Sequence, residues 1–476
     1  METCSWLTEG VTAAASWSRA QRRAAMWAFG LGLASVISSP GLVAQDGPSA
    51  PDARAAQMRE VLALYGLAAT DWPKEDRREI SNERGGAADA FLVRALYCLS
   101  RLPPDRLQPA AEDSTSRLSA IRAAPLSCQA LPVLLTGQVV SVEQVRLDAG
   151  LAGRVEFARY YRVTMFGPSA EHPWFVYALQ VPPTWLQAED LRETATASAI
   201  FLYGPGETEG GGALTFASRR IAWFPRTAAP QLGIGPAQAW LAKCGVDVGL
   251  LGELAARNRR PLTADDQDAF YQLLRAMSGG GPPPTIPTLA LEVAPLLVEP
   301  ERHHGQLVAV TGRARRVTKV RVDSPALRAQ YGLDHYYQID LFVPLDEQVI
   351  RLSKSPLTEA APTFEGAFPV TVCVPDVPAE LEVPEQLPLD VQMTAAFFKL
   401  WAYPSDYVSS FNPRQRQLSP MLIGTVPRRI RGESVNLQFG VGLAALLLLA
   451  LGGLWWGLLR QRRQPSVVRR VLDERS

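Results

Sequence analysis

Apolar residues along the chain follow helical spacing first and strand spacing afterwards, and this order occurs twice. Segment 58–67 places apolar side chains on one helical stripe and has Gly66, a residue suited to a helix C-terminus, near its end. A second stripe covers 87–102 and is followed by two prolines, which stop a helix. Segments 237–245 and 263–277 carry the corresponding stripes in the second half. Each half is therefore predicted to open with a pair of short helices.

Alternating apolar and polar residues predict five strands after each helical pair. In the second half the first strand is the longest, and Gly312 interrupts it, as glycine does where a strand bends or bulges. Strict alternation places one set of its residues on a single face: Val308, Val310, Ala314, Val320 and Val322. In the first half the strands are expected at 131–147, 159–166, 174–181, 194–203 and 213–224.

The two halves also share sequence. Thr136-Gly137 recurs as Thr311-Gly312, and the stretch 146–166 matches 321–342 in its first arginine, its Tyr-Tyr pair and its closing phenylalanine. Further matches keep the same order, with small changes in spacing between predicted elements. We interpret the pattern as duplication of a domain-sized unit, because solenoid repeats are shorter.

The duplicated units are assigned to 57–226 and 236–428. Each combines a long first strand broken by glycine with a longest connection between the third and fourth strands, which resembles the OB-fold barrel. The helical parts cover 57–105 and 236–278, and the barrels cover 130–226 and 305–428. An SH3-like or other small barrel is the alternative. The chain is also similar to exported, single-pass bacterial membrane proteins with tandem barrels, a resemblance that carries no catalytic residues. The expected fold class is α+β, with two such units and one C-terminal transmembrane helix.

The N-terminal residues 1–44 have the features of a secretory signal peptide. Arginines precede the apolar run 24–37, which is too short to cross a bilayer comfortably, and the small residue Ala44 follows. An uncleaved N-terminal anchor is the alternative.

Near the C-terminus, 439–459 contains no charged residue and has the length of a helix that crosses the hydrocarbon core. Trp455 and Trp456 suit the membrane interface, and the basic tail 460–476 predicts a cytoplasmic C-terminus. Together with the signal, these features predict a single-pass protein of the cell membrane with an extracytoplasmic body.

Charge and cysteine content restrict the chemistry. The formal net charge is +1, so no global field recruits polyions. Of the five cysteines, Cys4 lies in the predicted signal, and none of the others forms a CxxC pair. A bridge between Cys98 and Cys128 and a set of buried free thiols both agree with this spacing.

No catalytic, metal or cofactor motif stands out. GxSxG, Walker and HExxH sequences are absent, and the glycine-rich stretch 204–212 lacks the lysine of a phosphate cradle. We interpret His303-His304 as exposed loop residues and Asp334-His335 as part of a turn, because a metal site needs further spaced ligands. Neither a cofactor nor a metal is predicted.

The best candidate for ligand binding is a basic row on the first strand of the second unit. Its members are expected to share one outward face because side chains alternate along a strand. They are Arg313, Arg315, Lys319 and Arg321. Aromatic candidates for stacking on a ligand are Tyr336, Trp401 and Tyr403. A solvated strand face above core aromatics is the competing interpretation.

These observations favour a membrane-anchored, extracytoplasmic binding or scaffolding protein built on duplicated barrels. Its expected partners are the membrane, through the C-terminal helix, and an envelope protein or an anionic polymer. One alternative is an enzyme, or an enzyme subunit, with a site between the copies. A second is a binder of single-stranded nucleic acid or another polyanion, and export would disfavour nucleic acid.

Overall fold

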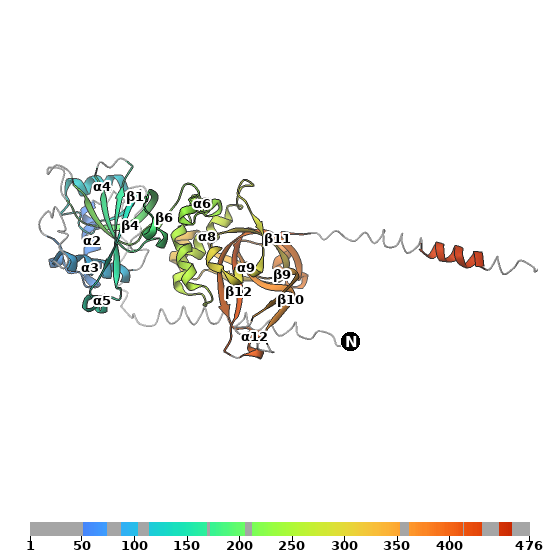
Figure 1. Ribbon diagram of the computed structural model, residues 1–476. Coiled ribbons are helices and arrows are strands. Elements are labelled where there is room, and N and C mark those ends of the chain that lie inside the picture. Colours follow the sequence, from blue (N-terminus) through green and yellow to red (C-terminus); the bar gives the residue numbers. More distant parts are fainter. Residues whose placement is uncertain are drawn as a thin grey trace, which may run out of the picture. The chain divides into compact units, whose positions relative to one another are not determined.

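The computed structural model describes residues 51–73, 87–102, 114–168, 172–204, 212–352, 361–412, 414–430 and 447–458. The chain divides into two compact units, Met1–Arg428 and Arg429–Ser476. The first unit has an α+β fold with two β-sheets (Figure 1). The predicted signal at 1–44 and the basic tail at 460–476 lie outside the described residues.

The first sheet closes into a five-stranded barrel. The strand order is β1-β2-β3-β5-β4, and β4 pairs back onto β1. Neighbouring strands are antiparallel except for β3 and β5, which run parallel. Short strand β6 extends the sheet beside β4. The strands are β1 (Pro132–Arg146), β2 (Arg159–Phe166), β3 (Trp174–Gln180), β4 (Glu193–Tyr203), β5 (Leu214–Arg220) and β6 (Ala222–Trp223).

The second sheet has the same order and the same closure. It runs β8-β9-β10-β12-β11, β11 pairs back onto β8, and β10 and β12 are its parallel pair. Short strands β7 and β13 lie at its margins. The strands are β7 (Leu289–Ala290), β8 (Leu307–Arg321), β9 (His335–Arg351), β10 (Thr363–Val374), β11 (Leu389–Tyr403), β12 (Gln417–Gly424) and β13 (Arg428–Arg429). The five strands expected in each half are therefore confirmed.

Helices precede each barrel and also connect its strands. The preceding helices are α2 (Pro51–Leu64), α3 (Ala87–Arg101) and α4 (Ser114–Ala123), then α6 (Pro236–Lys243), α7 (Val248–Leu254), α8 (Gln267–Ser278) and α9 (Val293–Val298). The connecting helices are α5 (Ala149–Val155), α10 (Pro325–Tyr331), α11 (Ala379–Glu382) and α12 (Asp406–Phe411). Short 3-10 turns are η1 (Ala69–Asp71), η4 (Pro183–Gln187), η6 (Pro230–Leu232), η7 (Ala255–Arg257), η8 (Ala264–Asp266), η9 (Pro300–Arg302) and η10 (Pro384–Gln386). The predicted pair of helices per half is thus found, with additional helices in both.

Glycine is required near the middle of the first strand of each barrel. A Cβ added at Gly137 would lie 2.3 Å from the carbonyl oxygen of Phe166, and one at Gly312 would lie 2.7 Å from that of Phe342. Both distances are shorter than any real Cβ contact, so no side chain fits without a backbone shift. The expected break in the long strand is therefore a close approach of two strands at Gly312.

Helices cover the outer face of each barrel, so much of this surface is inaccessible. Against the first barrel, α2 and α3 pack with outward-facing residues such as Tyr160 and Tyr177. Against the second, α8 packs with Tyr336 and Met421. The interior of the second barrel is a separate apolar core that includes Tyr337, as the alternation on β9 predicts.

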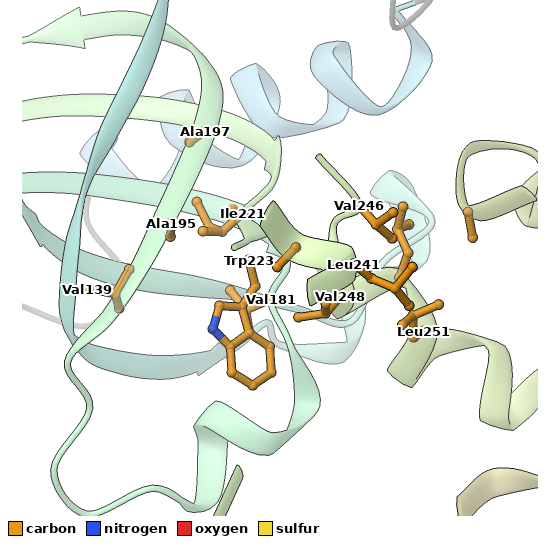
Figure 2. Packing of buried hydrophobic residues seen from close by; sticks show 14 of the residues in the cluster. Val139, Val181, Ala195, Ala197, Ile221, Trp223, Leu241, Val246, Val248 and Leu251 are labelled. Carbon is orange, nitrogen blue, oxygen red and sulfur yellow. The ribbon is translucent and has the colours of Figure 1, made fainter. Parts of the chain in front are cut away.

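The interior of the first barrel continues into helices that precede the second. Val139 and Ala195 of the barrel belong to the same buried cluster as Leu241 of α6 and Val248 of α7 (Figure 2). At this junction Trp223 lies among the labelled apolar side chains (Figure 2). One continuous hydrophobic core therefore joins the interior of the first barrel to the outer face of the second, whereas the interior of the second barrel remains separate.

The structure contradicts the predicted transmembrane helix at 439–459. Within this stretch it describes residues 447–458, which are helical. Residues 431–446 lie outside the described part. None of the helices in the described ranges combines the length and apolar character needed to cross a membrane. The predicted single-pass membrane localisation with an extracytoplasmic body is wrong for the same reason.

The bridge considered between Cys98 and Cys128 is absent. Both are buried free thiols, in different apolar clusters. The Sγ of Cys98 donates to the carbonyl oxygen of Tyr65 at 3.2 Å.

Candidate functional site at the end of the second barrel

A bulge divides the predicted basic row of β8 between two faces. The register with β9 slips between Ala314 and Arg316, which inserts one extra residue. Before the slip, Arg313 stands opposite Phe342, and after it Lys319 stands opposite Tyr337 of the barrel interior. Because paired residues lie on the same face, Arg313 and Lys319 point to opposite sides of the sheet. The expectation of one shared face for all four basic residues is therefore wrong.

Local contacts engage two of these cations. The guanidinium of Arg315 lies over the ring of Phe342 at 4.4 Å. The Nζ of Lys319 lies 5.1 Å from the ring centroid of Tyr337 and 4.0 Å from Oε1 of Glu382. The hydroxyl of Tyr337 donates to Glu382 and, by its hydrogen bond with Lys319, raises the pKa of the lysine. A carboxylate therefore already offsets the charge of Lys319. Arg313 and Arg321 are exposed.

The three predicted stacking residues lie in the layer between α8 and the barrel. Tyr336 is buried against Phe270 of α8, with ring centroids 5.1 Å apart. Trp401 is 3% exposed and stacks on Tyr403 at 4.7 Å, and burial raises the pKa of Tyr403. They are core residues, and the structure does not bring them together with the basic row.

Lys399 of β11 is a fully buried cation. Its Nζ lies 3.1 Å from Oδ2 of Asp266, whose Oδ1 accepts from Nε of Arg257 at 2.8 Å. The main-chain N–H of Thr263 also donates to Oδ2 at 3.0 Å, a capping-box contact at the start of η8. Burial lowers the pKa of Lys399, and the charge of Asp266 opposes this effect.

The ion pairs continue from Arg257 to the first barrel. Glu253 lies 3.9 Å from Arg257 and 3.5 Å from Arg220 of β5, and Arg220 lies 2.8 Å from Asp247. Asp247 also accepts hydrogen bonds from main-chain N–H groups, including that of Trp223 at 2.9 Å. Burial raises the pKa of Asp247, and Arg220 counteracts the rise. This row of ion pairs runs along the hydrophobic cluster that contains α6 and α7. It connects Arg220 of the first barrel with residues that pack on the second.

His304 is buried beside this row of ion pairs. Its Nδ1 lies 2.7 Å from the carbonyl oxygen of Phe398, and its Nε2 lies 2.9 Å from Nδ2 of Asn258. These contacts fit a neutral ring that donates from Nδ1 and accepts at Nε2. Burial lowers the pKa of His304 to about 4. The interpretation of His304 as an exposed loop residue is therefore wrong.

A hollow of about 270 Å³ near α8 is lined by Cys244, Gly245, Gln272, Arg275, Gln330 and Tyr331. The Tyr331 hydroxyl donates to Asp268 at 3.0 Å. All these residues lie within 236–428, the second half of the chain, so this hollow is not the site between copies that the enzyme alternative requires. The described residues contain no group of metal-ligating side chains that could hold an ion.

The strongest candidate for partner binding is a surface that we call the α12 surface, formed by α12 and the ends of β9 and β12. Its aromatic members are Tyr407 and Phe411, each 41% exposed. The hydroxyl of Tyr407 donates to the carbonyl oxygen of Thr363 at 2.9 Å, and the ring meets Phe364 edge-on at 5.4 Å. Thr363 and Phe364 of β10 thus hold the exposed ring of Tyr407 in a fixed position. In Figure 1, α12 lies at one end of the second barrel.

Three exposed arginines complete the α12 surface: Arg351, Arg414 and Arg416. Arg351 stands opposite Thr363, the residue that anchors Tyr407. Gln415, between the other two, donates from Nε2 to the carbonyl oxygen of Leu352 at 3.4 Å. These contacts place the main chain of the three arginines beside the segment that anchors Tyr407.

The α12 surface was not among the sequence-based candidates, although a signal exists. The connection between the last two strands reads "PSDYVSSFNPRQR", with aromatic residues four apart and two arginines two apart. Similarly, Lys399 interrupts the apolar strand "AAFFKLWAY", which indicates a buried cation that needs a partner.

No protein-family model matches the chain, and no curated protein matches it. Among solved structures, one match is a protein assigned as an aspartyl-tRNA synthetase from Leishmania major Friedlin, with 12% identity and a TM-score of 0.15. The match covers 48% of this chain and 47% of the other, so it spans about half the length of that protein. A likeness this low carries no argument about fold or function.

Proposed function

We propose that this chain is a binding protein in which a duplicated unit forms two OB-like barrels and the α12 surface receives the partner. The identical strand order of the two barrels supports the duplication. So do the glycines at equivalent positions of β1 and β8, and the seven-residue helices α5 and α10 between the first two strands of each barrel. The strand order also supports the OB-like assignment.

The observation that carries the binding role is the exposed and anchored ring of Tyr407. An aromatic side chain free to move would lose rotamer entropy on binding, whereas Tyr407 is already fixed by Thr363 and Phe364. Exposed aromatic residues next to arginines have the composition of binding hot spots.

The experiment compares partner capture by the wild type and by two matched variants. The immobilised chain is incubated with an extract of the cells that produce it, and bound proteins are quantified. Tyr407→Ser/Phe411→Ser removes the exposed rings of α12. The matched control, Leu126→Ser/Leu186→Ser, removes side chains of similar exposure, 44% and 40%, from the part of the chain that contains the first barrel.

The expected result is a protein retained by the wild type and by the leucine variant but lost from the α12 variant. Circular dichroism checks that both variants fold. If both variants retain the same proteins as the wild type, the α12 surface is not the binding site.

A further inference from the structure

We propose that the α12 surface binds an acidic protein segment that carries an apolar anchor residue. This inference rests on the binding role proposed above and defines the chemistry of the partner. It follows from the arrangement of the rings and from the charges beside them.

The rings of the α12 surface meet one another edge to face. Tyr407 meets Phe364 at an interplanar angle of 69° and Phe411 at 76°. Successive bases of a single-stranded nucleic acid stack on open ring faces along a groove. Edge-to-face rings instead present one edge and one face at an angle, a shape suited to an aliphatic or aromatic side chain. The geometry therefore favours a peptide over a nucleic acid.

The charges determine which peptide fits. Arg414 and Arg416 are exposed, and within the described residues neither forms an ion pair. Arg351 adds a third cation, and Asp406 of α12 adds a carboxylate. Glu365, exposed two residues beyond Thr363 on β10, adds a second carboxylate, so three guanidinium groups against two carboxylates leave the surface positive. Guanidinium groups bind carboxylates in a bidentate manner, so aspartates or glutamates on both sides of the anchor would complement the surface.

Fluorescence anisotropy of the full chain tests the proposal with three labelled probes. The first is a short peptide of aspartates and glutamates with one central leucine. The second replaces the leucine by serine, and the third is an oligothymidylate of similar length. Arg414→Glu/Arg416→Glu reverses the charge of the surface, and Arg154→Glu/Arg159→Glu makes the same change at exposed arginines of the first unit.

We expect the leucine peptide to bind best and the α12 charge reversal to weaken it about tenfold or more, while the control stays within about twofold of the wild type. Equal losses in both variants, tighter binding of oligothymidylate, or no peptide binding would overturn the proposal. If the extract experiment finds an α12-dependent partner but the peptide does not bind, the acidic class is wrong and the binding role stands. If neither experiment finds α12-dependent binding, both proposals fail.

Discussion

Replacing Asp266 by asparagine is expected to destabilise the protein far more than replacing Lys399 by methionine. Asp266→Asn leaves Lys399 fully buried without the carboxylate that pairs with it, because the amide of asparagine and the carbonyl oxygen of Pro261 at 3.5 Å are both neutral. Removing one partner of a buried ion pair costs about 3–5 kcal/mol, because the remaining charge is uncompensated. The asparagine also loses the charge that pairs with Arg257 at 2.8 Å.

Lys399→Met removes the cation instead, and Asp266 keeps Arg257 and the main-chain N–H of Thr263. Methionine has a similar volume and suits the apolar surroundings, so the expected cost is about 1 kcal/mol. The double variant should resemble Lys399→Met, because no buried lysine then remains.

The assay is urea unfolding at pH 7, followed by tryptophan fluorescence and circular dichroism. The free energies of unfolding of the two single variants and the double variant form a mutant cycle. A cost for Lys399→Met equal to or greater than that for Asp266→Asn would refute the reasoning that Asp266 is the shared partner of two cations.

Three further outcomes follow from buried or crowded groups. The pKa of His304 falls to about 4 on folding, from about 6.5 in the unfolded chain. The neutral buried ring therefore contributes stability that is fully present above pH 6.5 and is lost as the pH falls toward 4. Between pH 7 and pH 5 the loss is about 2 kcal/mol. The wild type should therefore lose more stability than His304→Gln over that interval, and parallel losses would contradict this. Gly312→Ala should lower the free energy of unfolding by about 1–3 kcal/mol, because its Cβ meets a strand carbonyl oxygen at 2.7 Å. The control in the same thermal melt is Gly153→Ala in α5, which has no atom within 4 Å and should raise stability by up to about 1 kcal/mol. Among the described cysteines Cys244 is exposed, whereas Cys98, Cys128 and Cys373 are buried. In a Cys4→Ser background one thiol of the native protein should therefore react with a disulfide reagent, and Cys244→Ser should abolish that reaction. A reaction that persists would show that a buried thiol is accessible.

The hydrophobic pattern predicts where the strands lie, but it does not predict which side chains of the long first strand share a face. Alternation on β8 holds up to Ala314 and then changes phase at the bulge. A glycine in the sequence indicates that a strand bends, but the position of the extra residue depends on pairing with β9, a tertiary contact. This is why Lys319 and Arg321 were assigned to the wrong face.

The candidate site was missed because composition does not distinguish a buried aromatic residue from an exposed one. Trp401 and Tyr403 occur in an alternating strand and end up beneath α8, a helix far from them in sequence. Tyr407 and Phe411 occur in a short helix between strands and remain half exposed. The difference arises from which helix covers which barrel face, and local periodicity contains no information on that pairing.

The core shared between the barrels has a consequence for how such a protein could change during evolution. Leu241 and Val248 belong by sequence to the second unit, yet they bury apolar residues of the first barrel, among them Trp223. A fragment ending near 226 would expose those residues to water, and an isolated second unit would expose α6 and α7. The two barrels with their helices are therefore not exchangeable modules, and loss or transfer of one barrel would require new polar residues at the exposed junction.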